Sequence, residues 1–227
     1  MTGGFTNDLL KGKRALVTGG GTGLGKAIGR RHLELGADLV ICGRRAEALD
    51  ATAREFEQAF GRKVGAISCD IRNADSVEAM FDRIWSSGPL DILVNNAAGN
   101  FIAQSHRLSS RAIDAVLNTC LHGTAYCTIA AGRRWIDGGH PGVVLSILTL
   151  SALHGAAFTM PNAMAKAGID AMTKGLAVEW GPHGVRLVAV APGNFPTEGA
   201  SSRLTPTAGG QPIDPGVPLR RDGSHRE

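Results

Sequence analysis

A glycine-rich stretch near the start of the chain constrains the fold more than any other feature of the sequence. The apolar run 15–17 precedes it, and the segment 26–33 that follows has the pattern of an amphipathic helix. The stretch reads Thr18-Gly19-Gly20-Gly21-Thr22-Gly23-Leu24-Gly25. Its glycines therefore lie where a buried strand turns into a helix. A helix N-terminus offers unpaired amides, and glycine lets a phosphate approach the backbone, so this turn predicts a nucleotide site.

The glycine spacing in this turn is Gly-x-x-x-Gly-x-Gly, at positions 19, 23 and 25, and differs from the more common Gly-x-Gly-x-x-Gly. We expect Gly19, Gly23 and Gly25 to approach a pyrophosphate and the Thr18 hydroxyl to brace the turn. A glycine-rich turn that binds no ligand is the alternative interpretation.

Strand and helix patterns alternate along the chain as far as residue 190. The expected strands are 14–17, 38–42, 63–69, 90–94, 142–146 and 185–190. The expected helices are 23–35, 46–60, 73–85, 110–136 and 161–180. Apolar strands separated by helices are typical of a parallel sheet that is covered on both faces. With right-handed crossovers, this order predicts an α/β, doubly wound Rossmann fold as a single domain over 1–227, with an irregular tail from about residue 198.

The bulk composition excludes several classes of protein. A 227-residue chain that is 43% hydrophobic can fill one sizeable core, and a net charge of only +4 makes nucleic acid an unexpected partner. The four cysteines lack metal-type spacing, so we expect reduced packing residues and no metal at Cys42, Cys69, Cys120 and Cys127. Neither a signal peptide nor an apolar run of 18 residues is visible, which predicts a cytoplasmic protein without a membrane segment.

Three further motifs give the chain a family resemblance. They are Asn95-Asn96-Ala97-Ala98-Gly99 after the fourth strand, Lys166 early in the helix after the fifth, and Pro192-Gly193-Asn194-Phe195-Pro196-Thr197 after the sixth. Together with the glycine turn, they resemble the short-chain dehydrogenase/reductase family. The segments 98–101, 161–168 and 195–200 resemble its 2,4-dienoyl-CoA reductase branch. That branch uses NADPH to reduce a conjugated dienoyl-CoA in the oxidation of unsaturated fatty acids.

The resemblance implies a dinucleotide site at the strand ends. The residues that it assigns to the cofactor are Thr18, Gly19, Thr22, Gly23, Leu24, Gly25, Arg44, Arg45, Asp70, Ile71, Asn96, Ala97, Ala98, Lys166, Pro192, Gly193, Phe195 and Thr197. Asp70 matches a residue that contacts adenine in the family, and an N-cap or turn role is the alternative.

The residues after the second strand predict which nicotinamide dinucleotide is bound. A carboxylate at this place would bond to the adenosine ribose hydroxyl and repel a phosphate. Gly43-Arg44-Arg45 stands there instead, and two guanidinium groups suit a 2′-phosphate. We therefore expect NADP(H), with a solvated arginine pair as the alternative interpretation.

Four residues are the candidates for catalysis: Lys166, Asn100, Ser151 and Asn162. By resemblance, Lys166 holds the nicotinamide ribose and Asn100 bonds to the thioester carbonyl, on which charge develops as hydride arrives. The family places a tyrosine where Asn162 stands. Some members of the branch instead carry a tyrosine at the position of Ser151. An asparagine amide cannot supply a proton at neutral pH, and a serine hydroxyl could at most orient a water.

Three other side chains bear on the proton donor. His122 replaces an asparagine of the family, and His154 lies in an expected loop at 152–155. Both titrate in the right range, although an exposed loop histidine is the expected reading for His154. The one tyrosine of the chain, Tyr126, has apolar neighbours and is expected to pack rather than to act as an acid.

The end of the sequence departs from the family pattern. The segment from Thr197 to about residue 210 has the position of a substrate lid. No counterpart of the closing helix and strand of the family is visible after it. Two interpretations are open: the protein continues beyond these residues, or it lacks this edge of the sheet. In the second case, we expect the strand 185–190 to form an exposed apolar edge, with damage to the tetramer interface that the family commonly builds there.

Three functions are consistent with these observations. The first is NADPH-dependent reduction of 2,4-dienoyl-CoA or a related enoyl thioester by a homo-oligomer. The second is reduction of a ketone or 3-oxoacyl thioester, against which the missing tyrosine argues because an alkoxide must be protonated. The third is cofactor binding without catalysis.

Overall fold

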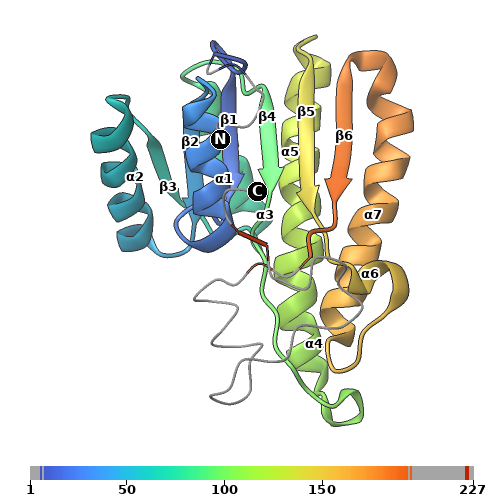
Figure 1. Ribbon diagram of the computed structural model, residues 1–227. Helices are drawn as coiled ribbons and strands as arrows, with labels where there is room; N and C mark the ends of the chain where they lie inside the picture. Colours follow the sequence, from blue (N-terminus) through green and yellow to red (C-terminus); the bar gives the residue numbers. More distant parts are fainter. Residues whose placement is uncertain (1–5, 7, 194, 196–222, 225–227) are drawn as a thin grey trace.

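A computed structural model describes residues 6, 8–193, 195 and 223–224. The strands are β1 (Arg14–Thr18), β2 (Asp38–Gly43), β3 (Gly65–Ser68), β4 (Ile92–Asn95), β5 (Gly142–Ile147) and β6 (Val185–Val190). The main helices are α1 (Gly23–Glu34), α2 (Ala46–Phe60), α3 (Ala74–Trp85), α4 (Ser110–Leu117), α5 (Gly123–Asp137) and α7 (Met160–Trp180), with a short α6 (Ser151–His154). Strands and helices alternate in the chain as the sequence pattern predicts (Figure 1).

The six strands form one parallel sheet in the order β3-β2-β1-β4-β5-β6. This is the strand order of a dinucleotide-binding Rossmann fold, which confirms the expected doubly wound architecture. The chain order reverses between β1 and β4, where Leu16 is in register with both Val40 and Leu93. Loops that follow β1 and β4 diverge to opposite faces of the sheet, so a ligand crevice is expected at their ends.

Two hydrophobic cores cover the two faces of the sheet. Residues of α1 and α2, including Leu33 and Phe56, pack with Val17 and Ile41 in one core. Helices α3, α5 and α7 cover the other face, where Trp135 lies in the core with its indole N–H donating to the Leu90 carbonyl at 2.6 Å. Figure 1 shows α1 in front of the sheet and α5 behind it.

Local signals explain where several helices begin and end. The Asn73 side chain accepts from the Ser76 amide and caps α3, and Ser109 caps α4 in the same way. Helix α2 ends at Gly61, whose φ of +64° is a left-handed conformation that glycine adopts without strain. Pro161 stands in the first turn of α7, where its missing N–H costs no helical bond.

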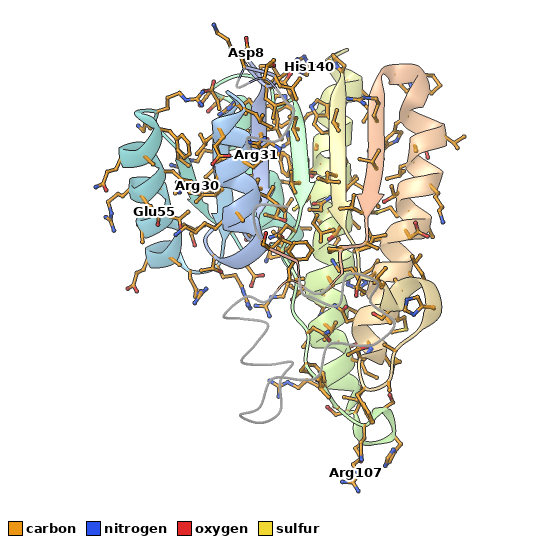
Figure 2. The ribbon with its side chains drawn as sticks, in the orientation of Figure 1. Asp8, Arg30, Arg31, Glu55, Arg107 and His140 are labelled. Carbon is orange, nitrogen blue, oxygen red and sulfur yellow. The ribbon has the colours of Figure 1, made fainter. Side chains whose placement is uncertain are left out.

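Charged side chains join helices on the surface. Figure 2 shows Arg30 of α1 and Glu55 of α2 at the junction of these helices, with 3.8 Å between their charged groups. Lys26 reaches the same carboxylate at 2.5 Å. Exposed pairs of this kind contribute little stability, so the cores carry most of it.

Some expected boundaries were wrong. Strand β3 is shorter than the expected strand 63–69, and β4 begins and ends later than the expected strand 90–94. The expected helix 110–136 is interrupted by a π-helical segment at Asn118–His122, and the expected loop at 152–155 largely belongs to α6. Backbone contacts from the rest of the fold decide these details, and the local pattern does not contain them. The expected lid and tail lie almost wholly outside the described residues, and within those residues β6 is an edge strand.

Two features bear on membranes and metals. No helix in the described ranges combines the length and apolar character needed to cross a membrane. In the same part of the chain, no three His, Cys, Asp or Glu side chains are grouped to hold a metal ion. All four cysteines are buried and free, as the composition predicts.

Candidate active site

The glycine turn and the loop after β4 are joined at the point where the strand order reverses. The Thr18 hydroxyl accepts hydrogen bonds from the backbone amides of Asn96 and Ala97, both at 3.0 Å. The Asn96 side chain donates to the Thr18 carbonyl at 2.9 Å. Thr18 therefore braces the turn, and the two loops form one rigid floor at the ends of β1 and β4.

Two glycines of the turn have separate reasons to be glycine. Gly19 has a φ of +68°, a conformation that side chains disfavour. A Cβ on Gly25 would overlap the Gly19 carbonyl oxygen and the Asn96 side chain. Gly25 is itself buried, so its first role here is close packing of the helix against the turn. This packing holds the N-terminus of α1 at the crevice.

The N-terminus of α1 has the properties of an anion site. Thr22 occupies the N-cap position, but its side chain accepts no hydrogen bond from the helix, and the first turn contains no acidic residue. The dipole and the amides of this turn therefore face the crevice without an internal counter-charge. The Arg45 guanidinium donates to the Thr22 hydroxyl at 3.4 Å, and Arg44 is also exposed. The charge of Arg45 thus lies beside the N-terminus of α1.

Asp70 follows β3, and its carboxylate is engaged within its own turn. The Arg72 side chain donates to both carboxylate oxygens, with Nε at 2.9 and 3.0 Å, and the Arg72 amide donates at 3.1 Å. Hydrogen bonds from Arg72 hold the pKa of Asp70 below its usual value, and the charge of Arg44 lowers it further. The turn role weighed for Asp70 therefore exists in the structure. Its neighbour Ile71 is buried and faces Gly123.

Lys166 is buried on α7, with only 4% of its surface exposed. Its ammonium donates to the Ile147 carbonyl at the end of β5, at 2.5 Å. Burial lowers the pKa of Lys166, and electrostatic interaction with Cys120 partly offsets this effect. Lys166 is therefore not a solvated lysine on the surface of the helix.

Asn162, one helical turn before Lys166, is also buried. Its side-chain amide donates to the Cys120 sulfur at 3.7 Å. Cys120 is the residue that the sequence analysis missed, because a cysteine without a motif reads as a packing residue. The sequence carries no motif that distinguishes Cys120 from the other three cysteines.

The other candidate residues lie on the segments around Lys166. The Asn100 side-chain oxygen accepts from the Phe101 amide at 2.9 Å. The hydroxyls of Ser151 and Thr149 are 3.3 Å apart at the start of α6. Neither side chain is fully buried, so both have surface available to a ligand.

The aromatic and histidine candidates lie on the outside of the helices. Tyr126 is 36% exposed, and the packing role expected for it is wrong, because its ring lies 6.2 Å from that of His122 rather than in a core. His122 contacts the Asn118 side chain at 3.0 Å. His154 is exposed, as expected, but it lies at the end of α6 rather than in a loop.

The segment after β6 is described only in part. Pro192 and Phe195 are half-buried, Gly193 is exposed, and Phe195 faces Gly223. Thr197 lies outside the described residues, as do residues 198–222 of the expected lid. The described residues of this loop follow the carboxyl end of β6. That end lies on the same side of the sheet as the carboxyl end of β1, where the glycine turn begins (Figure 1).

The family model named short chain dehydrogenase matches residues 13–207. The chain belongs to the short chain dehydrogenase family. The match covers the glycine turn, the loop after β4, Lys166 and the segment after β6. The resemblance on which the sequence analysis relied is therefore confirmed at the family level.

Relatives of this chain include several proteins that are named 2,4-dienoyl-CoA reductases or probable 2,4-dienoyl-CoA reductases. One named a probable 2,4-dienoyl-CoA reductase, from Bacillus subtilis, is 38% identical over 194 residues, which are 85% of this chain and 76% of the relative. An uncharacterized oxidoreductase of Caenorhabditis elegans is 46% identical over 86% of this chain. The chain spans only 63% of that relative's length. These names confirm the resemblance to the 2,4-dienoyl-CoA reductase branch.

A solved structure has the same fold. The crystal structure of a short chain dehydrogenase from Bacillus anthracis is 38% identical, with a TM-score of 0.85 over 96% of this chain and 86% of that one. The likeness in structure thus extends over nearly all of this chain.

Proposed function

We propose that this protein reduces a 2,4-dienoyl-CoA, or a related enoyl thioester, with NADPH in the oxidation of unsaturated fatty acids. The observation that carries the proposal is the arrangement on α7, where buried Asn162 stands one turn before buried Lys166. A phenol at that place would protonate the alkoxide of a reduced ketone, and an amide cannot. Reduction of a conjugated carbon–carbon bond needs no such alkoxide donor, and relatives that bear the name of this reaction support it.

The residues at the crevice fit an NADP(H) dinucleotide. The uncapped N-terminus of α1 and the glycine turn would receive the pyrophosphate, and Arg44 and Arg45 would bind a 2′-phosphate. Asn96, Ala97 and Ala98 would line the middle of the cofactor, and Lys166 would hold the nicotinamide ribose. The remaining cofactor assignments, Leu24, Asp70, Ile71, Pro192, Gly193, Phe195 and Thr197, belong to the same proposal.

The bound dinucleotide would supply a hydride. Asn100 would donate a hydrogen bond to the thioester carbonyl and so stabilise the charge that gathers on that oxygen. Lys166 would hold the nicotinamide ribose and place positive charge near the reacting atoms. Ser151, at the start of α6, would orient a water that carries the proton to the substrate.

The experiment that tests this function is NADPH consumption with a short 2,4-dienoyl-CoA, beside titrations of NADPH and NADH on the same sample. Turnover with NADPH and identification of an enoyl-CoA product are the expected result. Activity on a 3-oxoacyl-CoA with none on dienes would transfer the assignment to carbonyl reduction. Binding of NADPH with no turnover on either substrate would contradict both reductase assignments.

Cofactor binding without catalysis is a second candidate. The observation that favours it is that both polar side chains expected to act on the substrate have partners within the chain. Lys166 donates to the Ile147 carbonyl, and the Asn100 oxygen accepts from Phe101. The measurement of NADPH consumption above separates this candidate from the enzyme, because both would bind NADPH and only the enzyme would turn over substrate.

The proposal also includes a homo-oligomer in the cytoplasm, with 1–227 as one cofactor-binding domain. Apolar side chains on the outer faces of α5 and α7 support self-association, since Ile129 is 39% and Val178 is 81% exposed. Relatives named as peroxisomal enzymes make localisation of a tagged protein in its own cells a useful test of the compartment.

A further inference from the structure

The thiol of Cys120 lies where three elements of the candidate site meet, and the proposed reaction does not use it. Cys120 belongs to the π-helical segment between α4 and α5 and is completely buried. It packs in a small core with Val116 of α4 and Ala165 of α7. Ala165 is the residue that precedes Lys166.

The sulfur has polar contacts in two directions. The Gly99 amide donates to it at 3.3 Å, and the thiol can donate back to the Gly99 carbonyl, also at 3.3 Å. From the other side, the Asn162 side-chain amide donates to it at 3.7 Å. One atom thus connects the loop after β4 with α7. Both connected segments carry a proposed catalytic residue, since Gly99 precedes Asn100 and Asn162 stands one turn before Lys166.

The π-helical segment accounts for the position of the sulfur. A π-helical turn is wider than an α-helical one and shifts the side chains that follow it, and such turns are frequent at functional sites. Here the segment Asn118–His122 directs Cys120 inward, while Asn118 and His122 contact each other on the exposed side. The irregular turn therefore presents a thiol to Gly99 and Asn162.

We propose that Cys120 is a positioning residue, whose thiol ties the loop after β4 to α7 and so fixes Asn100 relative to Lys166. This inference rests on the proposed function, in which those two side chains act on the same substrate and cofactor. A sulfur atom suits the place because it accepts from N–H donors at 3.3 and 3.7 Å, whereas a hydroxyl oxygen would need its N–H donors at about 2.7–3.2 Å.

Cys127 provides a matched control. It is a free, completely buried cysteine on the same helical run, but it lies in the large core beneath the sheet and away from Gly99 and Asn162. Replacing either cysteine with alanine removes the same atom. Loss of packing alone would affect the two variants alike.

The first test compares the steady-state kinetics of Cys120→Ala and Cys127→Ala with NADPH and a 2,4-dienoyl-CoA. We expect Cys120→Ala to lower kcat about tenfold while the KM for NADPH changes less than about twofold, because geometry rather than cofactor affinity is lost. Cys127→Ala should keep the kcat of the unchanged protein. Cys120→Ser should recover only part of the loss.

The second test does not depend on turnover. Hydrogen exchange of the Gly99 amide, followed by NMR, should be about tenfold faster in Cys120→Ala than in Cys127→Ala. Equal exchange at Gly99 and equal kcat in the two variants would overturn the inference, even if the unchanged protein reduces dienes. A selective effect at Gly99 in a protein without diene turnover would support the link and refute the proposed function.

Discussion

At the residue scale, the site is built from polar groups that the fold has taken out of water. Lys166 is the clearest case, because a buried ammonium whose one hydrogen bond among the described residues is to the Ile147 carbonyl is costly for the folded state. Thr18 is different, because its buried hydroxyl has hydrogen-bond partners. It donates to the Val94 carbonyl and accepts from the amides of Asn96 and Ala97. Stability and function thus coincide at Thr18 and conflict at Lys166.

Replacing Lys166 with methionine is expected to abolish diene reduction and to stabilise the fold by about 1 kcal/mol at neutral pH. Burial lowers the pKa of Lys166 in the folded state below its ordinary value of 10.5. Between the two pKa values the unfolded chain binds more protons, so the wild-type free energy of unfolding rises with pH there. The advantage of Lys166→Met should therefore shrink as the pH rises through that window. Chemical denaturation at several pH values measures it, and an advantage that grows with pH would contradict the burial argument.

At the element scale, the sequence predicted the elements well and their contacts poorly. The glycine turn placed the start of α1 at Gly23, and the apolar strands predicted a parallel sheet whose order the structure confirms. The sequence did not predict the π-helical segment, the hydrogen bonds from Arg72 to Asp70 or the contacts of Cys120. Each depends on which side chains the folded sheet and helices bring together, and a linear pattern carries no signal for such contacts.

Substituting Gly25 with alanine tests the packing of the turn. A Cβ there would overlap the Gly19 carbonyl and the Asn96 side chain, so we expect a loss of about 1–3 kcal/mol in the free energy of unfolding. Gly175→Ala is the control, because a Cβ at that helical position meets nothing within 4 Å and should stabilise α7 by about 0.5–1 kcal/mol. Urea denaturation of both variants gives the comparison. Equal stabilities would show that the turn can relax around the added methyl group.

The loop between β2 and α2 is expected to set the choice of dinucleotide. Replacing both Arg44 and Arg45 with alanine should weaken NADPH binding about 10- to 100-fold, the loss expected for one or two charge-assisted hydrogen bonds. NADH affinity should change little, because NADH lacks the 2′-phosphate. Arg54→Ala, an exposed change on α2, serves as the control for the loss of one positive charge elsewhere on the surface. Equal weakening for both dinucleotides in a fluorescence titration would argue against a 2′-phosphate contact.

At the scale of the whole molecule, helices α5 and α7 on one face of the sheet expose several apolar side chains to the outside. On the α7 side, an outward row on that helix includes the exposed apolar residues Met164, Ala167, Ala171 and Val178, with exposed Lys174 and Gly175 between the last two. Tyr126 and Ile129 are exposed on α5, which packs beside α7. A surface of this kind on one protomer can pair with the same surface on a second copy about a two-fold axis. Figure 2 shows Arg107 far from this sheet, at the tip of the segment before α4.

The homo-oligomer is therefore expected to form through the outer face of α7. Val178→Glu would place a like charge opposite itself across a two-fold axis, and we expect it to convert the assembly to smaller species at micromolar concentration. Glu47→Gln on exposed α2 changes net charge by the same size on another surface and should leave the assembly intact. Light scattering after size-exclusion chromatography measures both. Because the cofactor crevice lies at the ends of β1 and β4 rather than on α7, NADPH affinity should survive Val178→Glu. An unchanged mass for Val178→Glu would move the interface to another face of the molecule.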